Sequence, residues 1–503
     1  MTGGSGKISV RINGKETKLQ YARVSAIPYN MWWPGHQRPL EGTEIAPFVS
    51  FTGDGAAEIR VRSEKIKSGS DIVVRPLNRG IAVSEEGEEA VFVLKEYGGY
   101  TFETDGFHEA LHIFFNPVRD FLSEEEKSGR NVLHYAPGEY HTGNVELPSH
   151  TSVVIDEGAV IYGSFTAICG NDIRVCGYGI IDGSSEERTD DTGVLPYSYY
   201  DRPHRCDLTK EENLKSVLSS DRMLNGCLRF YNCRDFSVEG VILRDSAAFT
   251  VIPANCDGFV IDNVKTIGMW RFNSDGIDLF NSRNAVIRNC FLRNFDDCIV
   301  IKGIRGWDTA NNENILVENC VIWCDWGSAL EIGAETNADL YRNIVFRNCD
   351  VIHGASVMMR IQNSNRADIR NVRFENIRTE FSRYCLPRKM MEEGVPYEGK
   401  PNTRQPRLFH LMIRQDTPYS DIPLSGTVDN VSIDGLHVYL DDEVSMPESD
   451  IQGKDRTHMI RNVRIGYVTV NGKPVPDFSR YVTVNAFTDN IIFDNNAIGG
   501  EKL

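Results

Sequence analysis

The amino-acid sequence predicts an all-β protein in which a β-sandwich precedes a right-handed parallel β-helix. Three observations carry this prediction. Short apolar runs alternate with polar, Gly- or Pro-bearing turns along most of the chain, and a motif ending in Asn recurs at nearly constant intervals beyond residue 260. Near residue 126 the sequence also changes, and beyond it short apolar runs are divided by Gly, Asn and Asp. Within 503 residues we therefore expect two domains, a sandwich at 1–125 and a β-helix at 126–503.

The predicted sandwich rests on strand-like runs divided by turns, a spacing that is typical of this fold. These runs are Lys7–Ile12, Ala57–Val61, Asp71–Val74, Ala90–Leu94 and Ala110–Phe115. The loop Asn30–Arg38 is aromatic and basic, and we predict that it plugs the interface between the domains. Residues Phe121–Gly129 are typical of a linker or a short helix.

The predicted β-helix rests on an internal repeat, in which an apolar residue, a variable residue and Asn precede Cys or a β-branched residue. The repeated residues are Asn263, Asn289, Asn319, Asn348 and Asn376, which are 26, 30, 29 and 28 positions apart. A fixed Asn in each turn of a coil predicts a stacked ladder of side-chain amides. Leucine-rich repeats are the competing architecture, but their leucine template is missing.

Two insertions interrupt the repeat. Residues 184 to about 225 are charged and carry Tyr197, Tyr199, Tyr200 and His204. Residues 381 to about 407 carry prolines and the basic residues Arg383, Arg388, Lys389, Lys400 and Arg404. Long loops on a repeat scaffold usually lie on its functional face, although some contact a partner subunit. We leave homo-oligomerisation open.

Composition excludes several classes of protein. A net charge of −17 argues against nucleic acid or an anionic membrane as partner, and the chain has no run of 18 apolar residues. The twelve cysteines form no CxxC pair, which predicts buried thiols rather than disulfides or zinc, and we expect no metal or cofactor. Because no signal peptide precedes the chain, we predict a cytoplasmic protein, or a secreted or periplasmic one if a signal was trimmed.

Two short acidic clusters are the strongest candidate for chemistry. Asp275 precedes Asp296 and Asp297 by about one coil, and the residues between them are strand-like. Stacking on neighbouring coils would place the carboxylates about 4.8 Å apart. Crowded carboxylates keep one proton and leave another group ionised, which suits acid/base cleavage of a glycosidic bond. The alternative is that these residues merely occupy turns, as Asp often does.

Four motifs in order resemble the polygalacturonase-like glycoside hydrolases of family 28, and more loosely the β-helical dextranases of family 49. The motifs are Gly177–Gly183, Asp245–Val251, Asn273-Ser274-Asp275 and Asp296-Asp297. The resemblance covers roughly residues 130 to 380. It implies a glycosidase that acts on α-linked sugars with inversion, with Asp296 as general acid and with Asp275 and Asp297 as bases. A spacing near 5 Å would by itself suggest retention, and here we follow the family.

Two further motifs depart from the family pattern. Ser328 stands where the family has a histidine beside the aspartates, and Arg360-Ile361-Gln362 stands where it has Arg-Ile-Lys. In the family that Arg–Lys pair grips a uronate carboxylate, so the loss of a lysine removes one positive charge. The resemblance therefore carries the reaction type better than the substrate.

Six other residues are candidates for substrate binding. Arg360 and Gln362 would contact the sugar, and Asn273 would bond either to the acidic cluster or to the sugar. Glu331 would take over part of the role of the missing histidine. Lys302 either contacts the sugar or pairs with an aspartate of the cluster. Trp326 is one of four tryptophans, with Trp270, Trp307 and Trp323, that form either a stacking platform for sugars or part of the core.

The predicted partner is an oligo- or polysaccharide, pectin-related or neutral, and we predict that the enzyme trims chain ends. The two insertions and the first domain would wall an open groove into a pocket. Two alternatives use the same fold. A polysaccharide lyase would yield an unsaturated product, and a non-catalytic carbohydrate-binding protein would release no product from any glycan.

Overall fold

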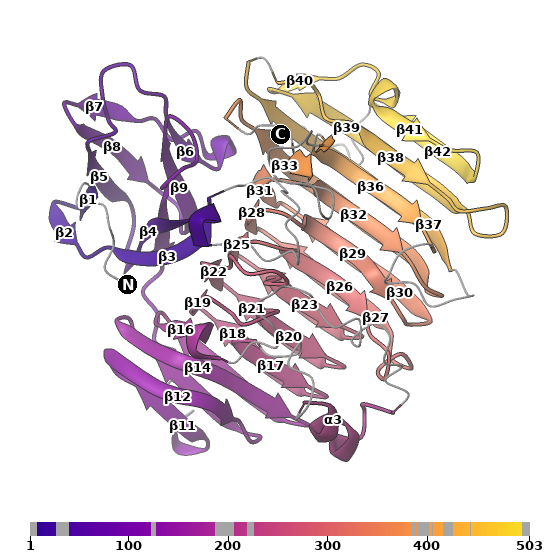
Figure 1. Ribbon diagram of the computed structural model, residues 1–503, viewed down its shortest axis with the longest axis horizontal. Coiled ribbons are helices and arrows are strands. Elements are labelled where there is room, and N and C mark those ends of the chain that lie inside the picture. The colour runs from indigo at the N-terminus through magenta and orange to yellow at the C-terminus, as the bar shows by residue number, and fades with distance from the viewer. Residues whose placement is uncertain are drawn as a thin grey trace.

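The computed structural model describes residues 8–26, 40–121, 127–186, 206–218, 226–384, 388–390, 402–404, 406–415, 426–442 and 444–494. Figure 1 shows a small domain, in indigo and violet, beside a long stack of parallel strands that runs from magenta to yellow. The aromatic loop 30–38, the tyrosines and histidine predicted at 197–204, and Lys400 lie outside the described residues. In the part of the chain that is described, no helix is long and apolar enough to cross a membrane.

The small domain consists of two five-stranded sheets. The first contains, in spatial order, β2 (Lys15–Thr17), β1 (Ile8–Ile12), β5 (Ala57–Ser63), β8 (Glu89–Leu94) and β7 (Ser84–Glu86). The second contains β3 (Gln20–Ser25), β4 (Thr43–Thr52), β10 (Leu111–Asn116), β9 (Gly98–Thr104) and β6 (Ile72–Arg75). Each of the five predicted runs coincides with a strand. In β5, Ala57, Ile59 and Val61 are buried while Arg62 is exposed, as the alternation of a half-buried strand requires.

The remaining strands form one sheet of 30 strands that coils on itself, as predicted, into a parallel β-helix. One column contains β11 (Asn131–Tyr135), β13 (Thr151–Ile155), β15 (Asn171–Gly177), β18 (Arg234–Glu239), β21 (Asp257–Asp262), β24 (Arg283–Arg288), β27 (Asn312–Glu318), β30 (Leu340–Arg347), β33 (Asp368–Phe381), β37 (Thr427–Leu440), β39 (Ile460–Val470) and β42 (Thr488–Asp494). We call it the first column.

The second column contains β16 (Ile180–Asp182), β19 (Ile242–Arg244), β22 (Lys265–Ile267), β25 (Phe291–Asn294), β28 (Val321–Cys324) and β31 (Asp350–Gly354). The third contains β17 (Leu228–Tyr231), β20 (Val251–Ala254), β23 (Ile277–Phe280), β26 (Ile299–Gly303), β29 (Ser328–Thr336), β32 (Val357–Asn363), β36 (Arg407–Ile413), β38 (Ser449–Gln452) and β41 (Val482–Val484). The long strands β12 (Gly138–Glu146) and β14 (Ala159–Ile168) span both of these columns at the start of the helix. The chain also forms a helix α3 (Glu211–Leu218), a hairpin of β34 (Arg388–Met390) with β35 (Asn402–Arg404), and the short β40 (Lys473–Pro474).

The predicted amide ladder lies at the turn between the first and second columns. Its five residues all adopt the left-handed conformation, with φ between 51° and 56°. Nδ2 of Asn319 donates to Oδ1 of Asn289 at 3.4 Å, and Nδ2 of Asn376 donates to Oδ1 of Asn348 at 2.7 Å. Asn tolerates this conformation better than most residues, which explains why the repeat requires it. The prediction of one stacked line is confirmed.

A second amide ladder, which the sequence analysis did not identify, lies at the start of the first-column strands. Nδ2 of Asn314 donates to Asn284, Asn343 to Asn314, Asn371 to Asn343 and Asn430 to Asn371, at 3.0, 3.0, 3.4 and 2.8 Å. These residues also have φ between 53° and 56°. The four coils that contain β24, β27, β30 and β33 thus use two left-handed asparagines each, one near the start of the strand and one at the turn that ends its first-column part.

The core of the helix is a continuous stack of apolar side chains. Phe236 lies parallel to Phe230 and to Phe259, with ring centroids 4.0 and 4.7 Å apart. Cys290, Cys320 and Cys349 stack in the same core, and the eleven cysteines of the described chain are all free thiols. Their prediction as small buried hydrophobes is confirmed for most of them, with Cys169 exposed and Cys206 half-buried.

The sandwich packs on the outer face of the second column. Phe48 and Phe114 of the sandwich join Phe291, Val321 and Trp323 of the helix in one apolar cluster. Buried charges surround this cluster. Glu103 accepts from Arg75 at 3.0 Å and contacts a ring nitrogen of His353 at 2.7 Å, and Arg75 also pairs with Glu380 of β33 at 2.5 Å. The two parts are therefore joined by a core and by a buried ionic network.

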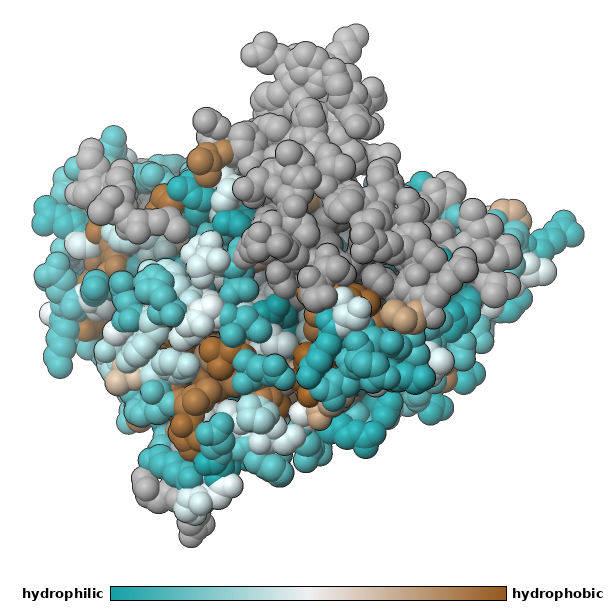
Figure 2. Space-filling view, turned by 60° about the horizontal axis from the view of Figure 1, so that its bottom comes forward, coloured by the Kyte–Doolittle hydropathy of each residue, from teal (hydrophilic) through white to brown (hydrophobic). Residues whose placement is uncertain are grey.

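The surface in Figure 2 is mostly hydrophilic, and its hydrophobic residues form short strips between polar ones. The large hydrophobic residues that are exposed in the described chain are Leu40, Val93, Tyr97, Val118, Val484 and Ile492. They come from both domains and from distant parts of the sequence. Tyr97 lines a cavity between the sandwich and the β-helix.

Candidate active site

The acidic residues of the two clusters lie at the turn between the second and third columns. Asp275 comes just before β23, and Asp296 and Asp297 come just before β26. The coils are held in register by backbone hydrogen bonds, from the N–H of Gly276 to the carbonyl of Asp297 at 2.8 Å and from Cys298 to Ser328 at 2.9 Å. The structure thus brings the three predicted catalytic residues to one edge of adjacent coils.

Gly327 shows how tightly the next coil approaches this turn. A Cβ atom at this position would lie 2.5 Å from the backbone nitrogen of Asp297 and 2.5 Å from its Oδ1. Real Cβ contacts are longer, so only glycine allows the approach. The same coil binds Asp297 directly, because the backbone N–H of Ser328 donates to Oδ1 at 2.8 Å. Asp297 is therefore oriented by the coil that follows it.

Lys302 of β26 pairs with the cluster rather than standing free for a sugar. Its Nζ lies 2.7 Å from Oδ2 of Asp275 and 3.0 Å from Oδ1 of Asp278. Asp278 is completely buried and belongs to the Asn-Ser-Asp-Gly-Ile-Asp stretch, although the sequence analysis assigned it no role. Asp275 and Asp278 lie on the same side because the turn ends and β23 begins between them. The alternation of side chains along a strand does not predict this arrangement.

The protonation of these groups follows from burial and mutual repulsion. Burial raises the pKa of Asp275 to about 6, with Lys302 opposing the rise and Asp297 adding to it. Burial and the charges of Asp275 and Asp297 raise the pKa of Asp296 well above its ordinary range. Burial opposes the charge of Lys302, but Asp275 and Asp278 outweigh it and hold its pKa well above the usual value. Burial likewise raises the pKa of Asp278 well above its ordinary range, with Lys302 opposing the rise and Asp275 adding to it. Asp296 and Asp278 are thus the carboxyls of the cluster that hold a proton most strongly.

The residues at the two motifs that differ from the family pattern form a second polar group, on β29 and β32. Glu331 and Arg360 are register partners, with Nε of Arg360 at 3.6 Å from Oε1 of Glu331. Arg360 also donates to the side-chain oxygen of Gln362 and, at 3.4 Å, to the hydroxyl of Ser328. Burial raises the pKa of Glu331 to about 8, although Arg360 opposes the rise. The four residues share one network, in which Glu331 holds its proton at neutral pH.

The other candidate binding residues have different surroundings. Asn273 lies two residues before Asp275 in the left-handed conformation with φ 56°. Its Oδ1 is buried and has no hydrogen-bond partner among the described residues. Trp326 is half-buried, with its ring 5.3 Å from Phe272 and 5.2 Å from Phe295. Trp307 and Trp323 are completely buried core residues, which removes them from the proposed sugar platform.

Trp270 lies near the sandwich and contacts Asp245. Its ring nitrogen donates to Oδ1 of Asp245 at 3.1 Å, and the guanidinium of Arg23 lies 5.9 Å from its ring centroid. In the described chain no group of three or more His, Cys, Asp or Glu side chains is arranged to hold a metal ion. The site as described consists of carboxyls, one lysine, one arginine and hydrogen-bonding groups.

Solved structures resemble the protein in fold. An exopolygalacturonase from Thermotoga maritima has a TM-score of 0.52 at 16% identity, and the likeness covers 74% of this chain and 86% of that one. Dex49A from Penicillium minioluteum has a TM-score of 0.58 at 13% identity, over 97% of this chain and 94% of that one. At such low identities these similarities establish the fold alone.

The sequence comparisons identify the family. A probable rhamnogalacturonase A of Aspergillus oryzae is 33% identical over 171 residues, which are 33% of this chain and 34% of that protein. The chain thus matches about a third of the length of that relative. The model of glycosyl hydrolases family 28 matches residues 171–469, more than half of the chain and the whole of the site described above. The protein belongs to glycosyl hydrolases family 28.

Proposed function

We propose that this family 28 member hydrolyses an α-type glycosidic bond of a pectic polysaccharide by acid/base catalysis with inversion. The observation that supports it is the carboxyl cluster, in which Asp296 lies beside Asp275 and Asp297 on adjacent coils and burial and these two charges raise its pKa well above the ordinary range. In this mechanism Asp296 gives its proton to the leaving oxygen. Asp297 and Asp275 take a proton from the water that attacks the anomeric carbon, so a hydroxyl is added as the C–O bond breaks.

The surroundings of Lys302 favour hydrolysis over a lyase reaction. A lyase on this fold would use a lysine or arginine as base, but Lys302 is paired with two carboxylates and its pKa is held well above the usual value. It therefore serves to keep Asp275 ionised and in place. A panel of glycans tests the proposal, with NMR of the first anomer formed. Retention, or an unsaturated product absorbing in the ultraviolet, would contradict it.

We propose that the substrate is of the rhamnogalacturonan type, in which a neutral sugar lies beside galacturonate, and that unbranched polygalacturonate is poor. Arg360 already contacts Glu331 and Gln362, and Gln362 donates to the hydroxyl of Ser364 at 3.0 Å. An amide offers both a donor and an acceptor to sugar hydroxyls, whereas an uncompensated uronate costs several kcal/mol to bury. The relatives named rhamnogalacturonase agree with this choice.

We expect Gln362→Lys to shift preference toward galacturonides. Turnover of oligogalacturonides and of rhamnogalacturonan oligomers should be compared for both proteins, at low and at high salt. The wild type should favour the rhamnogalacturonan oligomers, and the variant should lose part of that preference, because the added ammonium meets a second carboxylate. If galacturonides are cleaved best by both proteins to the same degree, Gln362 does not select the substrate.

We further propose that the enzyme acts from chain ends. The sandwich covers the second column, whose strands lead directly into the acidic turn, and helix α3 lies in the first insertion. Both would close a groove that otherwise accepts a running chain. Viscosity and released reducing ends should be followed together on a polymeric substrate. We expect mono- or disaccharides before any large drop in viscosity, and an early drop would show internal cleavage.

A further inference from the structure

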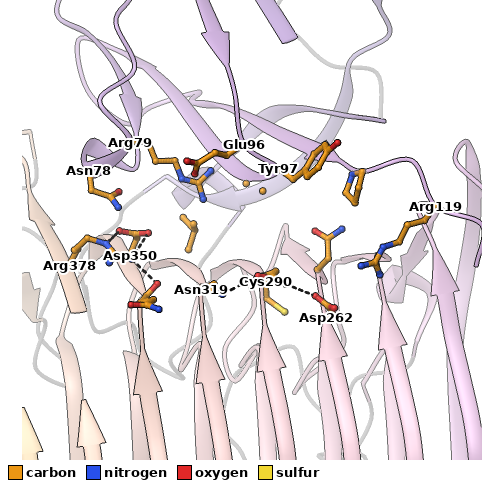
Figure 3. Close-up of a pocket in the computed structure, with 17 residues that line it drawn as sticks. Asn78, Arg79, Glu96, Tyr97, Arg119, Asp262, Cys290, Asn319, Asp350 and Arg378 are labelled. Carbon is orange, nitrogen blue, oxygen red and sulfur yellow. Dashed lines mark hydrogen bonds and ion pairs between the residues drawn. The ribbon is translucent and has the colours of Figure 1, made fainter. Parts of the chain in front are cut away.

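A second polar cavity lies between the sandwich and the helix, away from the acidic turn. Its volume is about 570 Å³, within the usual range of roughly 300–1,000 Å³ for small-molecule sites. Figure 3 shows Arg79, Glu96 and Tyr97 of the sandwich facing Asn319 and Asp350 of the helix across this cavity. The cavity follows the turn between the first and second columns, whereas the acidic cluster lies between the second and third. None of the residues proposed for catalysis lines it.

The amide ladder is interrupted inside this cavity. Asn289 and Asn319 are bonded to each other, as are Asn348 and Asn376, but no hydrogen bond of the described chain joins Asn319 to Asn348. Among the described residues, Oδ1 of Asn319 and Nδ2 of Asn348 therefore have no hydrogen-bond partner, and both residues line the cavity. An acceptor beside a donor, one coil apart, suits hydroxyl groups, which do both.

The outer ladder provides an internal comparison. From Asn284 to Asn430 its amides are bonded in an unbroken series, although the residues have the same left-handed backbone. The inner ladder has two breaks in the described chain, since Asn263 donates to Asn116 and Asn289 donates to Asp262 instead of to each other. The breaks are thus no general consequence of stacking asparagines at this spacing. They occur where the sandwich covers the turn.

The charges of the cavity balance, which favours a neutral occupant. Three arginines and three carboxylates line it: Arg79, Arg119, Arg378, Glu96, Asp262 and Asp350. Several are already neutralised, since Nη2 of Arg378 lies 3.1 Å from Asp350, Arg119 pairs with Glu239, and Asp262 pairs with Arg288 at 3.0 Å. A polyanion would meet no net attraction here.

An aromatic ring completes the lining. Tyr97 is 44% exposed, unusual for so large a side chain, and its ring packs edge-on against Phe115 with centroids 4.9 Å apart. Packing of this kind holds the ring in place while one side stays accessible. An apolar ring face beside hydrogen-bonding groups suits a pyranose, whose C–H groups pack on the ring while its hydroxyls bond to amides.

We propose that this cavity is a second, non-catalytic saccharide-binding site that takes a neutral segment of two or three sugars. Tyr97 would stack on one sugar, and Asn319 and Asn348 would bond to its hydroxyls. The site would hold a neutral part of the polysaccharide while the acidic turn acts on another. Binding here does not require the proposed hydrolysis, so the two proposals fail independently.

The test measures binding to the 503-residue chain carrying Asp296→Asn, which slows turnover. Maltotriose, isomaltotriose and α-1,4-galactotriose are the neutral probes, and trigalacturonate is the anionic one, with calorimetry and saturation-transfer NMR as readouts. We expect at least one neutral probe to bind. Tyr97→Ala and Asn319→Gly should each weaken that binding about tenfold, the effect of losing one stacking or hydrogen-bonding contact.

Asn314→Gly is the matched control. Asn314 has φ 55°, against 56° for Asn319, and its amide also donates to the preceding coil. It belongs, however, to the second ladder at the start of the first-column strands, outside the cavity. Asn314→Gly should leave saccharide binding unchanged. The thermal unfolding temperatures of Tyr97→Ala and Asn319→Gly should match that of Asn314→Gly, so that a loss of binding is not a loss of folding. The proposal is overturned if no neutral probe binds or if trigalacturonate alone binds. It is also overturned if Tyr97→Ala leaves neutral binding intact, since binding would then occur elsewhere.

Discussion

Replacing Asp296 by Asn is expected to lower turnover by a factor of about 10²–10⁴, the usual contribution of a positioned general acid. The amide has nearly the same shape and keeps an oxygen for the N–H of Asp297, which donates to Oδ1 at 3.1 Å. It has no proton to give to the leaving oxygen. Turnover should be measured on the preferred oligosaccharide, and ligand binding and thermal unfolding should stay near those of the wild type.

Asp339→Asn is a control for this variant, because Asp339 lies at a turn of the same helix with a side chain that is 76% exposed. It should keep full activity. Asp275→Asn and Asp297→Asn should also be severe, and the three effects should not add, because the groups act as a unit. An Asp296→Asn enzyme that retains more than about a tenth of the wild-type rate would assign the proton donor to another group.

Replacing Glu103 by Gln is expected to destabilise the protein by about 3–5 kcal/mol, the typical cost of breaking a buried ion pair from one side. Arg75 would keep Glu380 alone as anionic partner, and His353 would lose a contact of 2.7 Å. The free energy of unfolding should be measured by urea denaturation at pH 7. Glu88→Gln is the control in the same domain, because Glu88 pairs with Arg62 where both side chains are about 60% exposed.

The pH dependence gives a second readout. Although burial opposes it, the charges of Arg75 and His353 lower the pKa of Glu103 below its unfolded value near 4.5. The stabilising contribution is therefore complete above that unfolded pKa and is lost as pH falls through the folded pKa. The difference between wild type and Glu103→Gln should shrink on acidification below pH 4.5. A difference under about 1 kcal/mol at pH 7, the level of a surface ion pair, would show that the network does not join the domains.

The sequence by itself determined the coil. The recurring Asn, the small Cys beside it and the alternating apolar residues all describe contacts between a residue and its equivalent one coil away. Such contacts repeat with a period, so Asn263, Asn289 and Asn319 predicted the ladder that the structure contains. The spacing of about one coil also predicted Asp275 and Asp296 as neighbours, the family resemblance implied their roles, and the register of the coils places them at the same edge.

Only the tertiary structure decided what joins the two domains and what surrounds the acidic turn. Arg293 meets His112 at 2.8 Å across 181 positions of sequence, and Arg75 meets Glu380 across 305. Contacts of this kind occur only once, so they leave no repeating pattern in the sequence from which they could be predicted. The same reason explains why the choice between ion pair and sugar contact for Lys302 stayed open. Its two partners lie one coil back, and only the closure of that turn places Asp275 and Asp278 at 2.7 and 3.0 Å from one nitrogen.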